Sequence, residues 1–64
     1  MWYALSYGQP TALEAKSKRD LLIIVDPAGL STTLKLRSGI YEVGNWVLYR
    51  NKQDAIADGW GWAF

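Results

Sequence analysis

The sequence predicts one small α+β domain, residues 1–64, with a mostly antiparallel sheet of about five strands and one or two short helices. Short stretches rich in β-branched and aromatic residues recur along the chain, separated by glycine and proline, as in strands joined by tight turns. Two stretches open with a helix-capping residue followed by helix formers. A chain of 64 residues has room for one domain only.

Composition sets the conditions under which this domain folds. Half of the residues are hydrophobic, which favours a folded chain over a disordered one. The chain has no cysteine and no histidine, so neither a disulfide nor a structural zinc site can stabilise it. A core of this size supplies at most roughly 3–5 kcal/mol of net stability. We therefore expect very tight packing or self-association to supply the rest.

The first twenty residues predict a strand and then a helix. Trp2 to Tyr7 is a strand with alternating faces, and Gly8-Gln9-Pro10 ends it. Thr11 and Glu14 fit a capping box, so our first expectation is a short helix over 12–20. The alternative is a strand over 11–15 followed by a later helix that begins at Ser17.

The central part predicts a hairpin. The apolar run at 21–25 has the length of a strand that is buried on both faces. Asp26-Pro27-Ala28-Gly29 has the residues of a type I turn. The stretch 30–37 alternates leucine or threonine with polar and basic residues, which predicts a return strand with its leucines in the core.

The last third predicts a bent strand, a helix and a terminal strand. After a turn at Ser38-Gly39, the strand covers 40–50 with a bulge or bend at Gly44-Asn45. Asn51 caps a short helix that Gly59 ends in the left-handed conformation. In GWGWAF, residues 59–64, the large side chains alternate with small ones, which predicts a strand with a buried aromatic face. We expect it to pair with the first strand or with a partner chain.

The resulting order, β-α-β-β-β-α-β, resembles that of ferredoxin-like and SPOR-type domains, and the resemblance covers element order alone. A small SH3-like or OB-like barrel is the alternative if residues 11–20 are not helical. Neither architecture implies a function by itself.

The residue inventory argues against an enzyme. Without histidine or cysteine the chain lacks the commonest general base and the strongest nucleophile. Each of the six carboxylates has a capping, turn or surface role available, and the pair Asp54 and Asp58 is a weak candidate for a hard cation. We expect no catalytic residue, metal or cofactor. No apolar run approaches a membrane span and no signal peptide is evident, so we expect a cytoplasmic protein that does not enter membranes.

The aromatic residues predict a binding surface. Four Trp and four Tyr exceed what so small a core encloses comfortably, and these residues dominate interaction hot spots. We expect a non-catalytic binding module, of the size of small accessory or inhibitor proteins such as those of phages, that acts on a partner protein or by self-association. The alternative is binding of single-stranded nucleic acid or a nucleotide ligand, because basic residues are interleaved with the aromatics. The predicted partner-binding residues are Trp2, Trp46, Trp60, Trp62, Phe64, Lys35, Arg37 and Arg50.

Overall fold

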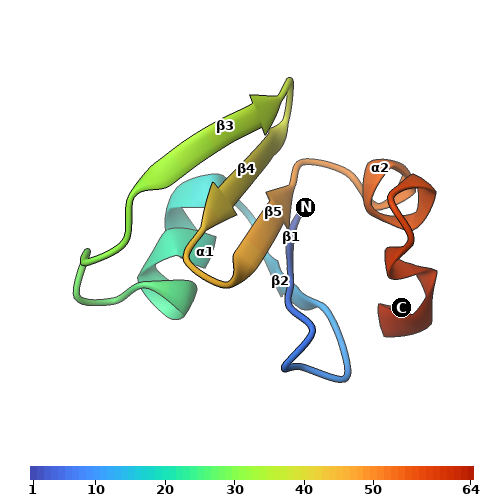
Figure 1. The fold of residues 1–64 in the computed structure, drawn as a ribbon, viewed down its shortest axis with the longest axis horizontal. Coiled ribbons are helices and arrows are strands. Elements are labelled where there is room, and N and C mark those ends of the chain that lie inside the picture. The colour runs from blue at the N-terminus through green and yellow to red at the C-terminus, as the bar shows by residue number, and fades with distance from the viewer.

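A computed structural model describes the whole chain, residues 1–64, as a five-stranded sheet with two short α-helices and a terminal 3-10 helix (Figure 1). The elements in chain order are β1 (Trp2–Leu5), β2 (Leu13–Ala15), α1 (Lys18–Val25), β3 (Thr33–Arg37), β4 (Ile40–Val43), β5 (Trp46–Tyr49), α2 (Lys52–Ala57) and η1 (Trp60–Ala63).

The strands lie in the order β2-β1-β5-β4-β3, and every neighbouring pair is antiparallel. The first and last strands of this order are free edges, so the sheet is open and does not close into a barrel. The predicted α+β class with an antiparallel sheet of about five strands is thus confirmed. The SH3-like or OB-like barrel is wrong.

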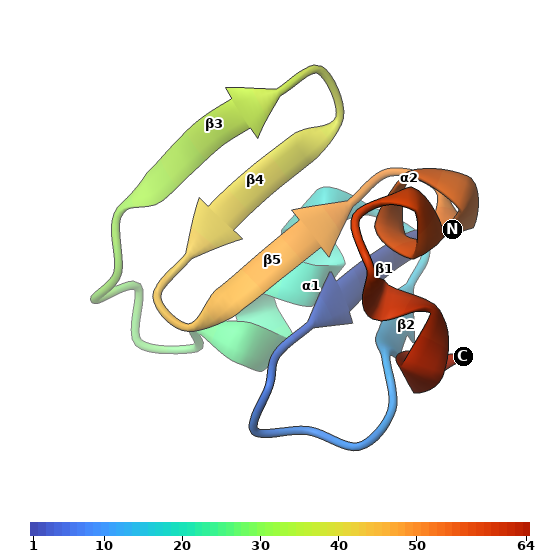
Figure 2. The same ribbon diagram turned by 45° about the vertical axis from the view of Figure 1, so that its right-hand side comes forward.

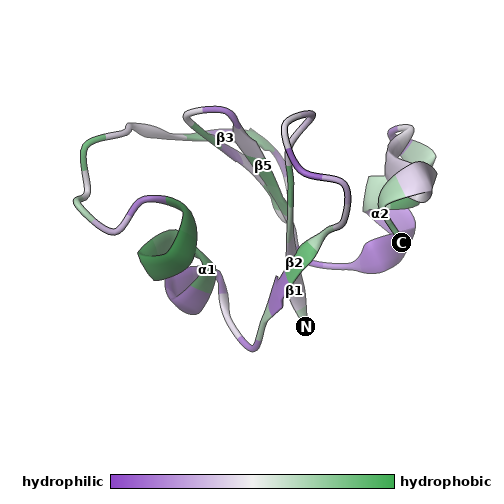
Figure 3. Cartoon of the chain, turned by 90° about the horizontal axis from the view of Figure 1, so that it is seen from below, coloured by the Kyte–Doolittle hydropathy of each residue, from purple (hydrophilic) through white to green (hydrophobic).

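The helices lie on opposite faces of the sheet (Figure 3). We call these the α1 face and the α2 face. On the α1 face, Leu21 of the helix packs with a buried residue from each of β1, β4 and β5, namely Ala4, Val43 and Leu48. On the α2 face, the core consists of Leu5, Ile40, Tyr49, Ala55, Trp60 and Ala63. Two small cores therefore share one sheet.

The alternation predicted for the first strand is confirmed. Its even-numbered residue Ala4 lies in the α1-face core and Leu5 lies in the α2-face core. The same holds for the neighbouring strand β5, where Leu48 lies in the α1-face core and Tyr49 lies in the α2-face core. Period-2 alternation separates the faces wherever a strand is covered on both sides.

The helix expected over 12–20 is wrong, and the alternative, a strand followed by a helix that begins at Ser17, is confirmed. Residues 13–15 are β2, and α1 begins after Ser17, whose hydroxyl accepts a hydrogen bond from the Asp20 amide at 3.1 Å. The apolar run 21–25 is consequently helical and not a strand. The side of the helix that carries Leu21, Leu22 and Val25 packs against the sheet. For so short an apolar run, periodicity alone cannot distinguish a helix from a strand.

The hairpin predicted around Asp26 is also wrong, although the turn itself forms. The Gly29 amide donates to the Asp26 carbonyl at 3.0 Å, and the Asp26 carboxylate accepts from the amides of Leu30 and Ser31, each at 3.1 Å. The turn therefore ends a helix and leads to the sheet edge. There the predicted return strand shortens to β3, and its leucines are exposed because no helix covers that edge.

The strand expected over 40–50 is two strands joined by a tight turn. Val43 pairs with Trp46, so Gly44 and Asn45 form a two-residue loop. Gly44 has φ +58° while Asn45 has negative φ, which is the pattern of a type II′ turn and one that suits the twist of paired strands.

The helix capped by Asn51 is confirmed, and so is the left-handed Gly59 that follows it, with φ +99°. The terminal strand is wrong, since Trp60–Ala63 forms the 3-10 helix η1. β1 already has β2 and β5 as neighbours, so it offers no free edge to a further strand. The terminal segment docks on the α2 face, where the Ala63 carbonyl accepts a hydrogen bond from the Ala12 amide at 3.1 Å.

Candidate functional site: an exposed aromatic surface

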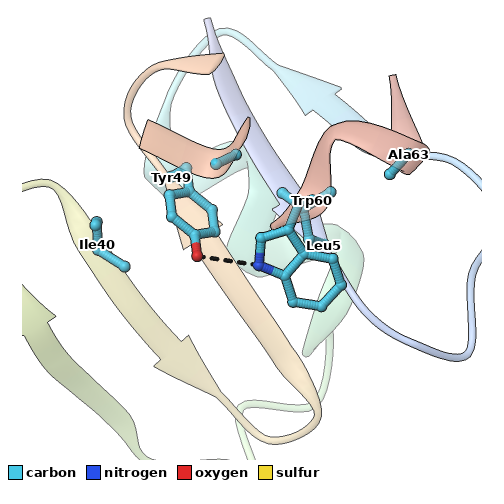
Figure 4. Packing of buried hydrophobic residues seen from close by; sticks show 6 residues of the cluster. Leu5, Ile40, Tyr49, Trp60 and Ala63 are labelled. Atoms are coloured by element: carbon cyan, nitrogen blue, oxygen red, sulfur yellow. Dashed lines mark hydrogen bonds between the residues drawn. The ribbon is translucent and has the colours of Figure 1, made fainter. Parts of the chain in front are cut away.

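Trp60 anchors the terminal segment. Gly59 turns the chain back over the sheet, and the Trp60 side chain is buried in the α2-face core (Figure 4). Its indole N–H donates a hydrogen bond of 3.1 Å to the hydroxyl of Tyr49 on β5. A buried indole N–H would otherwise lack a partner, so this bond fixes the position of the ring.

The Tyr49 hydroxyl makes a second hydrogen bond, to Asp58. It donates to the Asp58 carboxylate at 2.7 Å, and the same carboxylate oxygen accepts from the guanidinium of Arg37 on β3. One carboxylate thereby ties an edge strand, a central strand and the end of α2 together. This arrangement gives Asp58 a structural role.

The surroundings of Tyr49 raise its pKa from 10.0 to about 12. Burial of the hydroxyl is the main cause, because it disfavours the charged phenolate, and the hydrogen bond to Asp58 adds to it. A general base near neutral pH needs a pKa close to the working pH, and this shift moves Tyr49 the opposite way. The Tyr49 hydroxyl is therefore neutral at such a pH, and it both donates and accepts a hydrogen bond.

Two further aromatic rings, those of Tyr7 and Trp62, lie against Trp60 from the solvent side. The Tyr7 ring lies 4.6 Å from the Trp60 ring and 6.3 Å from the Trp62 ring, centroid to centroid. Trp62 is itself 5.7 Å from Trp60. Phe64 meets Tyr3 of β1 edge to face at 5.5 Å. We call Tyr3, Tyr7, Trp60, Trp62 and Phe64 the aromatic surface.

The outer members of the aromatic surface remain open to solvent despite these contacts. Tyr7 is 86% exposed, Trp62 is 52% exposed and Phe64 is 41% exposed. The Lys52 ammonium lies 5.2 Å from the Phe64 ring and is the one cation stacked on this surface. The structure has no pocket on this surface.

A second aromatic group occupies the α1 face. Trp2 and Tyr41 lie 6.1 Å apart, and the Lys18 ammonium sits 3.9 Å from the Tyr41 ring. Trp46 packs against the core on the same face. All three rings are partly buried, so they complete the α1-face core.

The structure separates the eight predicted partner-binding residues. Trp62 packs on the buried Trp60, whereas Phe64, at the end of the same segment, packs on Tyr3. Trp2 and Trp46 lie on the opposite face of the sheet. Lys35 and Arg37 lie on the edge strand, and Arg50 follows β5, where its amide donates to the Gly39 carbonyl at 2.9 Å.

Sequence reasoning left Tyr3 and Tyr7 out of that set. The signal was present, because alternation in the first strand puts Tyr3, Leu5 and Tyr7 on one side. Alternation does not tell which element of the chain covers this side of the strand. The terminal 3-10 helix supplies that cover.

The structure contains no group of three or more acidic, His or Cys side chains placed to hold a metal ion. No helix has the length and apolar character that a membrane span requires. No protein-family model, curated protein or solved structure matches this chain.

Proposed function

We propose that this protein is a non-catalytic module that binds a partner protein through the aromatic surface. The observation that carries the proposal is the exposure of Tyr7 and Trp62, which project from the surface while packed on the buried Trp60. Exposed aromatic clusters on small domains usually mark interaction sites.

The arrangement suits protein recognition in two respects. Tyr and Trp offer large contact areas with few rotatable bonds, so ordering them on binding costs little entropy. Here the neighbouring rings already restrict them before binding. Such pre-ordered aromatic side chains are the type that dominates binding energy at protein interfaces.

Two observations favour a protein over a nucleic acid as partner. A single-strand site needs a basic groove beside its stacking rings, and Lys52 is the one cation stacked on these rings. Arg37 is held by Asp58.

The proposal is tested by affinity capture from a lysate of the cells that make the protein. We expect a partner retained by the wild-type chain and by Ile23→Ala, an exposed α1 residue on the far side of the sheet, and lost from Trp62→Ala. Circular dichroism should show that all three chains are folded. If Trp62→Ala retains the same partners, or unfolds, the aromatic surface is not the site.

Salt dependence separates the two partner classes. Binding through aromatic contacts should change little between low and moderate salt, whereas nucleic-acid binding weakens steeply as counterions compete. A labelled single-stranded oligonucleotide, titrated at both salt concentrations, measures the second class directly. Tight, salt-sensitive binding of the oligonucleotide would overturn the protein-binding proposal.

A further inference from the structure

The outer edge of β3 is an open strand edge. β3 pairs with β4 alone, and the side chains of all its residues are exposed. Figure 2 shows no helix or loop alongside its outer side. No hydrogen bond outside the sheet ladder uses the backbone of residues 33–37. Backbone donors and acceptors on this side therefore face solvent, which is the arrangement to which an extended peptide adds a strand.

The two ends of β3 differ in their geometry. Residues 33–35 pair with consecutive residues of β4, so their side chains alternate regularly between the two faces of the sheet. The register shifts between Lys35 and Arg37, which is the position of a bulge. A bulge disrupts strand pairing, so the part of the edge that suits a further strand is residues 33–35.

Positive charge gathers on the α1 side of this edge. Lys35 lies opposite Tyr41, which packs against the α1-face core, so the Lys35 side chain lies on the α1 face as well. The Lys18 ammonium sits 3.9 Å from the centre of the same Tyr41 ring. Neither lysine is in an ion pair, since the one ion pair of the chain joins Arg37 to Asp58.

The acidic side chains near β3 do not offset this charge. On the α2 side, Asp58 is paired with Arg37, and Glu42 of β4 lies on the same side. The Asp26 carboxylate accepts hydrogen bonds from two backbone amides in the loop that precedes the strand. The α1 side of residues 33–35 is therefore both open along its backbone and positively charged.

We propose that the β3 edge binds an extended acidic segment of a partner protein, which adds a strand along residues 33–35 and places carboxylates beside Lys35 and Lys18. Backbone hydrogen bonds hold such a strand, and charge selects its sequence. On the α2 side, an apolar residue of the segment covers Leu34, which is 51% exposed. The segment that fits best alternates acidic and apolar residues. This second interaction surface does not include the aromatic surface.

The same features disfavour other occupants of the edge. A second copy of this chain brings Lys35 and Arg37 close to their own counterparts, and like charges across a strand pair are destabilising. A nucleic acid offers negative charge, but it has no peptide backbone that extends a sheet. An acidic strand matches both the open backbone groups and the unpaired lysines.

Peptide binding tests the proposal. The probe is a fluorescent peptide that alternates glutamate and valine, and a matched peptide with glutamine in place of glutamate measures the effect of charge. We expect a Kd between about 10 μM and 1 mM for the glutamate peptide, because the contact is small, and binding weaker by about tenfold for the glutamine peptide. A glutamate peptide that does not bind at about 1 mM, or that binds no better than the glutamine peptide, overturns the proposal.

Charge reversal locates the binding. Lys35→Glu should weaken binding of the glutamate peptide by about tenfold or more. Lys16→Glu, the same change at an exposed residue beside the opposite edge strand β2, should have little effect at physiological salt, which screens distant charges. Trp62→Ala should bind the peptide like wild type, and circular dichroism should show that all three variants are folded. Equal effects of the two lysine changes, or loss of binding in Trp62→Ala, overturn the assigned edge.

Strand pairing is tested separately from charge. A glutamate peptide with methylated backbone amides keeps its charge but cannot donate ladder hydrogen bonds, so it should bind about tenfold more weakly. Hydrogen exchange of the open amides in residues 33–35 should slow when the unmodified peptide binds. Equal binding of the methylated peptide, or unchanged exchange, overturns the added strand. A labelled single-stranded oligonucleotide that binds wild type but not Lys35→Glu, while the peptide does not bind, assigns the edge to nucleic acid instead.

Discussion

At the scale of single residues, Tyr49 connects more of this structure than any other polar side chain. Its hydroxyl accepts from Trp60 and donates to Asp58, which in turn holds Arg37. The three partners come from η1, the end of α2 and β3. Losing this hydroxyl would leave the buried Trp60 N–H without an acceptor.

The raised pKa of Tyr49 predicts a loss of stability at alkaline pH. The folded chain holds this phenol proton up to about pH 12, whereas the unfolded chain releases it near 10.0. The stabilisation is therefore complete below pH 10 and is lost as pH rises from 10 towards 12. Ultraviolet absorbance of phenolate and denaturant unfolding, measured over that range, should show a late titration step that accompanies unfolding.

Tyr49→Phe is the control for this titration. It should lack the late step, and at neutral pH it should be less stable by about 1–3 kcal/mol because the Trp60 N–H loses its acceptor. Tyr41→Phe, whose hydroxyl makes no hydrogen bond within the chain, should retain both the late step and the stability. A late step that survives in Tyr49→Phe would contradict the assignment.

At the scale of elements, helix caps and glycine turns depend on local sequence, although the capping box at Thr11 and Glu14 does not form because Leu13–Ala15 is a strand. Ser17 and Asn51 each accept a hydrogen bond from the amide three residues later, at 3.1 and 2.9 Å. The segments that follow them share a similar pattern because both are capped helix starts. This local chemistry is readable without knowledge of the fold.

The glycines on either side of Trp60 provide a prediction about the terminal segment. Gly59 has φ +99° and open space at its Cβ position, so Gly59→Ala costs backbone strain alone, about 1 kcal/mol or more. Gly61 lacks positive φ, and an added Cβ would make an ordinary 3.8 Å contact with Ile56. Gly61→Ala should be neutral or slightly stabilising in urea unfolding. Equal effects at both positions would contradict the left-handed role of Gly59.

At the scale of the whole molecule, stability depends on two small cores on opposite faces of one sheet. Each contains few large side chains, and Trp60 is the largest in the α2-face core. A chain of this size has little stability in reserve. Removal of one anchor therefore affects the entire domain.

Substitutions of Trp60 and Trp62 test whether one buried side chain supports the whole domain, because both residues lie in η1 but only Trp60 is buried. Trp60→Ala removes a buried indole, which typically costs about 3–5 kcal/mol, and should leave the chain largely unfolded at room temperature. Trp62→Ala removes an exposed ring and should unfold within about 1 kcal/mol of wild type. Thermal unfolding followed by circular dichroism measures both. Similar losses in the two variants would mean that Trp62 belongs to the core.

The sequence by itself determined the fold class, the alternation of β1 and β5, the cap at Asn51 and the turn at Gly59, and it offered the cap at Ser17 only as the alternative to one at Thr11. These features depend on residue type and spacing within a few positions. The division of the predicted binding residues did not follow from spacing, since Trp2 and Trp60 lie on opposite faces of the sheet.

Only the tertiary structure decided three other segments. The run 21–25 is a helix because its capped start and one apolar side fit the sheet. β3 is exposed because neither helix covers the edge that it occupies. The terminal GWGWAF segment is a 3-10 helix because β1 already has two neighbouring strands, so Trp60 is buried by docking instead of strand pairing. In each segment the outcome depended on which surface was left free after the rest of the chain had packed.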